Sequence, residues 1–445
     1  MHKYYNETLG FYESPFFRLH VETTSEPLDL NHMEERDAAV FIHEYIHFLQ
    51  AVSTIYGLNQ IHITVEYIRD AINWIYSHPR PSSFKVPIKP QEMRCKNVYY
   101  NWRIFKLTQG DSSDWNNISS ITAAVPIQEE IAKNCKIPTI NSIMMSFHDN
   151  EDNEEYYIFG STCIMESMAY MLEKYISPKG YIKSSDLPYN SALLLANKIH
   201  PNFAQNPLNI LALCDCSLQT SNPGLYFFQS LTDWGIKNYT PSTPDEIYDN
   251  FYKLSWKTSI LEKNDFISHL TSMMDIVRKQ LREYFKPDES NPMNPWSIKI
   301  NNIRGWIDDL LDTAIYLRKE HKTFILDLAR GGERFENKML QYIHKELGVP
   351  FCINKIGKAF VYHKKFQPKN ITNLDYFMAI SQIFNTLNGT KRRCELFQLC
   401  KISGKKTKDS LCDTPWVMFK TEHYLCPYAL MWHHWHLDGY IPDFE

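Results

Sequence analysis

The segment Ala38–Val52, AAVFIHEYIHFLQAV, constrains the fold of this 445-residue sequence more than any other. It contains no proline or glycine, and apolar residues lie all round its helical projection, so it predicts a buried helix. The surrounding pattern extends that helix from Glu34 to about Tyr56. A buried polar side chain without a partner costs about 1–3 kcal/mol. The polar residues of this segment therefore need partners.

These polar residues form one stripe, which consists of His43, Glu44, His47 and Gln50. At about 100° per residue, the two histidines and Gln50 fall within roughly 60° of one another, and Glu44 lies beside them. Histidines four residues apart project from one face, where their imidazoles can bind one Zn²⁺. The glutamate between them can take a proton from a water on the metal. An ordinary hydrogen-bond network inside a packed core is the alternative.

The pattern His43-Glu44-Tyr45-Ile46-His47 is HExxH and resembles the active-site helix of the zincin metallopeptidases. The longer metzincin motif is absent, because Gln50 stands at the position of its glycine and Ser53 at that of its third histidine. The resemblance therefore implies that the third ligand lies elsewhere. In the gluzincin branch, it is a glutamate on a later helix.

Glu166 is the candidate for that third ligand. It lies in an apolar helical segment, Ser161–Tyr175, where a lone carboxylate needs a cation or a hydrogen-bond donor. An ion pair with a lysine or arginine would also satisfy it. Glu173, two turns later, is an alternative ligand, and His148 and His200 are more remote ones.

Three further residues are candidates for supporting the ligands or the transition state. Tyr170 stands where gluzincins often have an aspartate, and it would steady a ligand, stabilise an oxyanion or simply pack. Asp215 lies in an apolar helical run, and a buried carboxylate there can accept a proton from the outer nitrogen of a ligating histidine. Gln50 shares the stripe of the two histidines.

The chain as a whole is predicted to be α+β and predominantly helical, with a zincin-like active-site helix and a small antiparallel sheet. Ile140–Phe147 and Glu155–Phe159 are predicted strands joined by a polar turn, and Phe16–Val21 is a further candidate. The resemblance implies an edge strand beside the active-site helix, to which an extended peptide adds, and Ile140–Phe147 is the candidate. Further helices are predicted at Asn59–Tyr76, Ser161–Ile176, Asn190–Ile199, Leu208–Leu218, Pro244–Leu254, Phe266–Tyr284 and Asn301–Arg318.

A proline-containing stretch at Pro287–Pro295 suggests a division of the chain. Residues 1–290 are predicted to form a zincin-like catalytic domain with an irregular insert at about 78–136. Residues 291–445 are predicted to form a mostly helical region whose end contains cysteines and histidines.

Charge and hydropathy argue against several classes of partner. With 47 Lys and Arg against 51 Asp and Glu, the net charge of −4 provides no field for nucleic acid or an anionic membrane. There is no uninterrupted apolar run of 18 residues, so we expect no membrane partner. The first residues lack a basic-then-apolar signal pattern, so we expect a cytoplasmic protein whose ten cysteines are reduced.

Two clusters near the C-terminus are weaker candidates for a second metal site. Cys394, Cys400, Cys412 and Cys426, with His423, lack the paired CxxC of zinc knuckles. Trp432–His436 is rich in histidine, but packing of a terminal segment is the favoured interpretation. The basic residues between Lys391 and Lys408 are interpreted as a solvated loop.

The sequence thus predicts a zinc metallopeptidase, with endopeptidase activity favoured, that hydrolyses a protein or peptide. Zn²⁺ would be held by His43, His47 and Glu166, and Glu44 would be the general base. One alternative is a zinc-binding regulatory module without activity, and another is a helical interaction protein without metal. A regulatory partner remains undefined.

Overall fold

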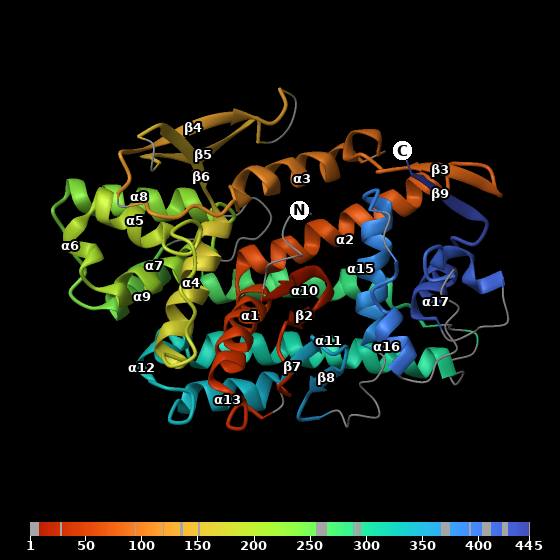
Figure 1. The fold of residues 1–445 in the computed structure, drawn as a ribbon. Coiled ribbons are helices and arrows are strands. Elements are labelled where there is room, and N and C mark those ends of the chain that lie inside the picture. Colours follow the sequence, from red (N-terminus) through yellow and green to blue (C-terminus); the bar gives the residue numbers. More distant parts are fainter. Residues whose placement is uncertain are drawn as a thin grey trace.

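Helices dominate the architecture, and short strands lie partly among the helices and partly at the edges (Figure 1). The computed structural model describes residues 9–26, 29–93, 95–118, 120–133, 137–149, 152–254, 265–287, 290, 295–365, 374–390, 393–402, 411–420 and 426–444. The prediction of a predominantly helical α+β fold is confirmed.

The segment with the polar stripe forms helix α1, Glu35–Ser53, and is almost entirely buried. The chain turns at Thr54, whose hydroxyl accepts the N–H of Gly57 at 3.0 Å and so caps the next helix, α2, Ile55–Ile75. A side chain at Gly57 would meet the Ala51 backbone at 2.5 Å, so a glycine is needed where α2 leaves α1.

Three elements hold α1 in place. Helix α4, Ser161–Ile176, packs along it, as do helix α11, Pro295–Glu320, and the strand pair near the N-terminus. The prediction of a helix at Ser161–Ile176 is therefore confirmed. Because α1 and α4 lie side by side (Figure 1), polar residues on their facing surfaces can meet.

Two sheets lie on different sides of this helical centre. One has the order β1-β2-β7-β8 and combines antiparallel pairs with a parallel pair between β2 and β7. The other has the order β4-β5-β6 and is antiparallel throughout. Their strands are β1 (Gly10–Glu13), β2 (Arg18–Val21), β7 (Val349–Asn354), β8 (Ala359–Tyr362), β4 (Ala123–Glu130), β5 (Thr139–His148) and β6 (Glu154–Phe159). A third pair joins β3 (Ser82–Val86) and β9 (Tyr440–Phe444) in parallel.

The remaining helices follow the predicted pattern with additions. Helices α7, α8 and α9 each begin with proline after a capping Asn206, Asn222 or Thr243, whose side chain accepts a backbone N–H. The helices are α3 (Lys96–Gln109), α5 (Ser191–Ile199), α6 (Pro201–Ala204), α7 (Pro207–Leu218), α8 (Pro223–Ile236), α9 (Pro244–Tyr252), α10 (Phe266–Tyr284), α12 (Phe324–Arg330), α13 (Lys338–Leu347), α15 (Asp375–Leu387), α16 (Phe397–Ile402) and α17 (Pro427–His434), with short 3₁₀ helices at Ser14–Phe16, Pro90–Glu92 and Pro415–Lys420.

Three local predictions need correction. The insert at 78–136 is not irregular throughout, because it contains α3, fourteen residues without proline or glycine. The strand predicted at Phe16–Val21 begins only at Arg18, because Ser14–Phe16 forms the 3₁₀ helix. The predicted edge strand Ile140–Phe147 lies in β5, which pairs with a strand on each side and so has no free edge.

The division near residue 290 stays a prediction, and several contacts cross it. Strand β2 pairs with β7, and the buried Arg18 on β2 forms an ion pair with Glu395 at 2.5 Å.

No helix among the described residues is both long enough and apolar enough to cross a membrane. None of the nine cysteines in the described part of the chain forms a disulfide.

Candidate metal centre

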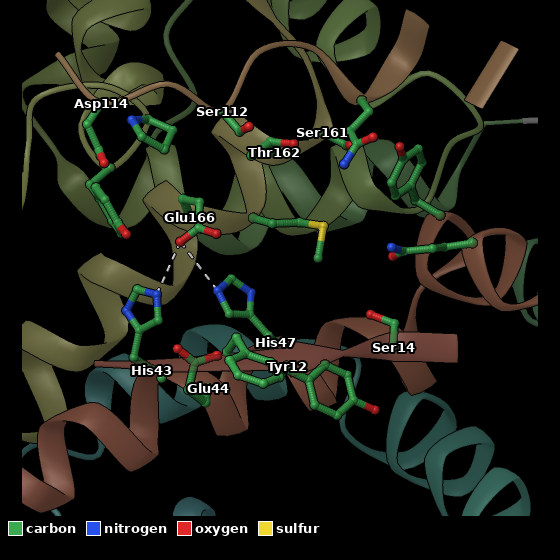
Figure 2. Close-up of a pocket in the computed structure, with 18 of the residues that line it drawn as sticks. Tyr12, Ser14, His43, Glu44, His47, Ser112, Asp114, Ser161, Thr162 and Glu166 are labelled. Carbon is green, nitrogen blue, oxygen red and sulfur yellow. Dashed lines mark hydrogen bonds and ion pairs between the residues drawn. The ribbon is translucent and has the colours of Figure 1, made fainter. Parts of the chain in front are cut away.

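Two histidines of α1 and one glutamate of α4 converge on a single point (Figure 2). His43 Nε2 lies 3.2 Å from Glu166 Oε2, and His47 Nε2 lies 3.4 Å from the same oxygen. With metal–ligand bonds of about 2.0–2.1 Å, a tetrahedral zinc ion requires its ligand atoms to be about 3.3 Å apart. The two measured distances fit a zinc ion, all three atoms lie within 4.8 Å of one another, and imidazole nitrogen and carboxylate oxygen are zinc ligands.

The outer ring nitrogens are held by two other side chains. His43 Nδ1 donates to Glu173 Oε2 at 3.0 Å, and His47 Nδ1 donates to Gln50 Oε1 at 2.8 Å. Gln50 in turn donates from Nε2 to the Met165 carbonyl of α4 at 3.0 Å. Both rings therefore turn Nε2 toward Glu166, and once a ring is neutral with its proton on Nδ1, that Nε2 would offer a lone pair to a metal.

Glu173 is thus placed as the partner of a candidate ligand rather than as a ligand. Its Oε2 faces His43 Nδ1, whereas its Oε1 accepts the N–H of Ile182 at 3.3 Å. Gln50, the other candidate on the stripe, is hydrogen-bonded to His47, and its supporting role stays a prediction.

The charges in the cluster stabilise one another. Burial lowers the pKa of His43, but its hydrogen bonds with Glu166 and Glu173 raise it more, and the result is well above the ordinary value. Burial raises the pKa of Glu166, but the positive charge of His47 and the hydrogen bonds from both histidines hold it well below its usual range. Glu166 is therefore a carboxylate at any ordinary pH, as a metal ligand must be.

Glu44 differs from the other carboxylates of the cluster. Its side chain is buried and lines a cavity in front of His43, His47 and Glu166. No described residue forms a hydrogen bond or ion pair with it. Burial is the main reason that its pKa rises to about 7, although the nearby positive charges of His47 and His43 oppose the rise. A carboxyl group with a pKa near neutrality is suited to both accept and donate a proton.

The cavity in front of these residues measures about 300 Å³. Its walls come from α1, α4, β1, the first turns of α2, the end of α3, the loop with Ser112 and Asp114, and Tyr189. Neither lysine nor arginine is among the described residues that line it. Strand β1 is the outer strand of its sheet as described, so β1, and not β5, is the edge strand that borders the site.

Two residues predicted to support the site lie elsewhere. Asp215 does not reach a histidine, because its carboxylate accepts two hydrogen bonds from Arg318, at 2.6 and 2.7 Å, and one from Tyr248, at 2.8 Å. Tyr170 does not line the cavity, because its hydroxyl is hydrogen-bonded to Tyr181. A buried carboxylate is satisfied best by a full opposite charge, and Arg318 provides one.

The remote alternatives for the third ligand are also placed elsewhere. His148 pairs with Asp152 at 3.1 Å, and His200 Nε2 bonds the Tyr239 carbonyl at 2.9 Å. Among the tyrosines that line the cavity is Tyr189, whose ring centroid lies 5.9 Å from that of His43. Tyr189 lies in the chain between α4 and α5, outside any helix or strand, so no periodic pattern could identify it.

In the described part of the chain, the C-terminal cysteines lie near one another, with Cys394 N donating to Cys412 O at 2.9 Å, but they do not bring three ligand atoms within 4.8 Å. Within the described residues, the group whose histidine, cysteine or carboxylate ligand atoms come this close consists of His43, His47 and Glu166. Trp432 is a core residue, and His433 pairs with Asp438. His423 and several of the basic residues between 391 and 408 lie outside the described residues.

Comparison with protein-family models, with curated proteins and with solved structures gives no match. The residues of the site itself are therefore the basis for a functional proposal.

Proposed function

We propose that this chain is a zinc-dependent peptidase that hydrolyses a peptide bond in a protein or peptide, with endopeptidase activity favoured. The observation that supports the proposal most directly is the convergence of His43, His47 and Glu166 beside the unpartnered carboxylate of Glu44. Three protein ligands with an open fourth position are the arrangement of catalytic rather than structural zinc.

The residues of the chain have separate roles in this proposal. His43, His47 and Glu166 would hold the ion, and Glu173 and Gln50 would keep the two rings in position. When bound, zinc would polarise the carbonyl and lower the pKa of water. Glu44 would take a proton from the attacking water and return it to the nitrogen of the leaving amine.

Substrate binding is proposed along β1. Strand β1 lines the cavity, and the addition of an extended peptide to a strand is a general mode of recognition. Main-chain pairing of this kind does not require a free terminus, which favours endopeptidase activity. The position of β1 is held at its end by Glu13, which accepts hydrogen bonds from Arg18, at 3.2 Å, and Ser381, at 2.8 Å.

Two other functions remain as alternatives. In a helical interaction protein, the two histidines and their carboxylates would form an ion-pair network and nothing more. A zinc-binding regulatory module would bind the ion but hydrolyse nothing. Glu44 argues against both, because a buried carboxylate without a partner stabilises neither a core nor a structural metal site.

The first test is the zinc content of the wild type and of Glu166→Ala, purified side by side without added metal. We expect about one zinc per chain in the wild type, as for a single site, and loss of zinc in the variant. Glu283→Ala, a change at an exposed position of α10, is the control and should keep its zinc. Wild type without zinc after reconstitution would refute the proposal.

Glu44→Gln then separates a peptidase from an inactive zinc protein. It should retain zinc and lose hydrolysis of a casein or mixed-peptide substrate. Equal hydrolysis by wild type and Glu44→Gln would remove Glu44 from the mechanism.

A further inference from the structure

Helix α4 begins at the wall of the cavity, and its first N–H groups have no partner. Its first helical bond runs from Ile164 N to Gly160 O at 3.3 Å. The N–H groups of Ser161 and Thr162, both in the cavity wall, form no hydrogen bond with any described residue. Free amides at the start of a 16-residue helix carry the positive end of its dipole, about half an elementary charge.

The sequence prevents this helix from capping itself. The residue before it is Gly160, where a side chain would meet the Gln109 backbone of α3 at 2.5 Å. Serine, threonine, asparagine and aspartate, the usual capping residues, are therefore excluded from that position. The close approach of α3 thus leaves the amides of Ser161 and Thr162 for another acceptor.

Buried hydroxyls from two other elements also lack partners around the cavity. Tyr56 of α2 is 1% exposed, and its hydroxyl lies near those of Ser161 and Thr108 without a hydrogen bond of ordinary geometry. Ser14 is 4% exposed, and its hydroxyl forms no hydrogen bond with any described residue. Figure 2 shows Ser14 on the wall opposite Ser161 and Thr162, directed into the space between them. Buried polar groups are normally satisfied, so unpartnered ones that line a cavity point to a ligand.

The balance of donors and charges indicates which ligand. Gln109 Oε1 accepts a hydrogen bond from Lys106 Nζ at 3.2 Å, which leaves the amide NH₂ of this lining residue as a donor. Of the acidic groups on this side, Asp111 accepts the N–H of Ile158 at 2.8 Å, and Asp114, which lines the cavity, accepts the hydroxyl of Ser185 at 2.6 Å. With amide and hydroxyl donors but no lysine or arginine in the wall, the site suits one carboxylate rather than a phosphate.

We propose that the N-terminus of α4 is a carboxylate-binding subsite that recognises an acidic group of the substrate, and this rests on the proposed peptidase function. Ser161 precedes Glu166 by five residues, or about 7.5 Å along the helix axis. An extended peptide advances about 3.3–3.6 Å per residue, so the carboxylate would lie about two residues from the bond that is cleaved. The C-terminal carboxylate and the side chain of Asp or Glu are two sources of the same chemistry.

The test measures binding to the full chain, in the Glu44→Gln background to prevent turnover. The probes are acetyl-Ala-Ala-Ala with a free C-terminus, the same peptide as an amide, and acetyl-Ala-Glu-Ala-amide, each titrated calorimetrically with and without zinc. We expect at least one of the two acidic peptides to bind about tenfold more tightly than the uncharged amide. Preference for the free C-terminus identifies that source, and preference for the Glu peptide identifies the side chain.

Ser161→Asp places a carboxylate at the first helical position, where an acidic residue favours the helix. It should abolish the preference for acidic peptides, both with zinc and without it. Gln229→Glu adds the same charge at an exposed position of α8 outside the cavity and should leave the preference intact. Ser161→Ala removes only the hydroxyl and should weaken the preference without abolishing it.

Equal binding of acidic and uncharged peptides, a preference that survives Ser161→Asp, or no binding of any probe would overturn the subsite. These outcomes are separable from failure of the proposed function. Wild type that cleaves uncharged peptides while showing no acidic preference keeps the peptidase and loses the subsite. Selective binding without any hydrolysis by the wild type keeps the subsite and loses the peptidase.

Discussion

Replacement of Glu173 should weaken zinc binding although its carboxylate faces the outer nitrogen of His43 and not the point where His43, His47 and Glu166 converge. Its carboxylate is 5% exposed and holds His43 Nδ1 at 3.0 Å. Loss of such an outer partner typically reduces metal affinity by about 10–100-fold, which corresponds to about 1.4–2.8 kcal/mol. Glu173→Gln keeps an acceptor oxygen without the charge and should lie near the lower limit. Glu173→Ala also leaves the N–H of Ile182 without its acceptor and should lie near the upper limit.

The assay is competition for zinc between the protein and a chromophoric chelator of known affinity at one pH. The expected order of affinity is wild type, Glu173→Gln, Glu173→Ala and then Glu166→Ala, which lacks a ligand altogether. Glu283→Ala, the exposed control, should match the wild type. Urea unfolding in the presence of a strong chelator separates lost affinity from lost stability. Unchanged zinc affinity in Glu173→Ala would show that the geometry of His43 does not depend on Glu173, and the reasoning would fail.

Three further predictions concern Glu44, Gly10 and the Asp215–Arg318 pair. Burial raises the pKa of Glu44 from 4.5 to about 7, so folding of the zinc-free chain takes up a proton, and its free energy of unfolding should fall as the pH rises from 4.5 to 7. Glu44→Gln should remove that part of the fall in urea titrations at several pH values, and identical profiles would contradict it. A side chain at Gly10 would meet Glu44 Cγ at 2.8 Å, so Gly10→Ala should displace the base and reduce kcat by about 10–100-fold at unchanged zinc content. Asp215→Ala leaves Arg318 buried and unpaired and should cost about 3–5 kcal/mol in urea unfolding, whereas Asp215→Ala with Arg318→Met should cost less than the single change.

Local patterns were sufficient to predict the two helices that carry the site. The ranges of α1 and α4 follow from apolar periodicity that lies wholly within each segment, and β5 and β6 follow from alternation around a polar turn. Two predictions, the irregular insert at 78–136 and the edge strand at Ile140–Phe147, were wrong for different reasons. Prolines around residues 79–90 and a polar run after residue 109 obscured the helical pattern of α3. The edge strand at the site was missed because β1 is only four residues long and its sheet is completed by β7, from the far end of the chain.

Glu166 and Glu173 differ in position in a way that the sequence alone could not predict. Seven residues separate them, which is about 700° around a helix, so both lie on nearly the same face and both were reasonable candidate ligands. Only the way α1 and α4 pack decides that Glu166 meets the inner nitrogens of His43 and His47 while Glu173 meets the outer nitrogen of His43.

That packing also distinguishes a catalytic interpretation from a structural one. Among the described residues, every polar side chain of the stripe on α1 has a hydrogen-bond partner except Glu44, and Glu44 lines the cavity. An ion-pair network that served only stability would gain nothing from a buried carboxylate that it leaves unpaired, because the desolvation of that group is not offset. If the cluster were structural, Glu44→Gln would therefore be neutral or stabilising and would change no other property. If the cluster is catalytic, Glu44→Gln also abolishes hydrolysis while zinc is retained. A change in the stability of the fold alone cannot produce that second effect.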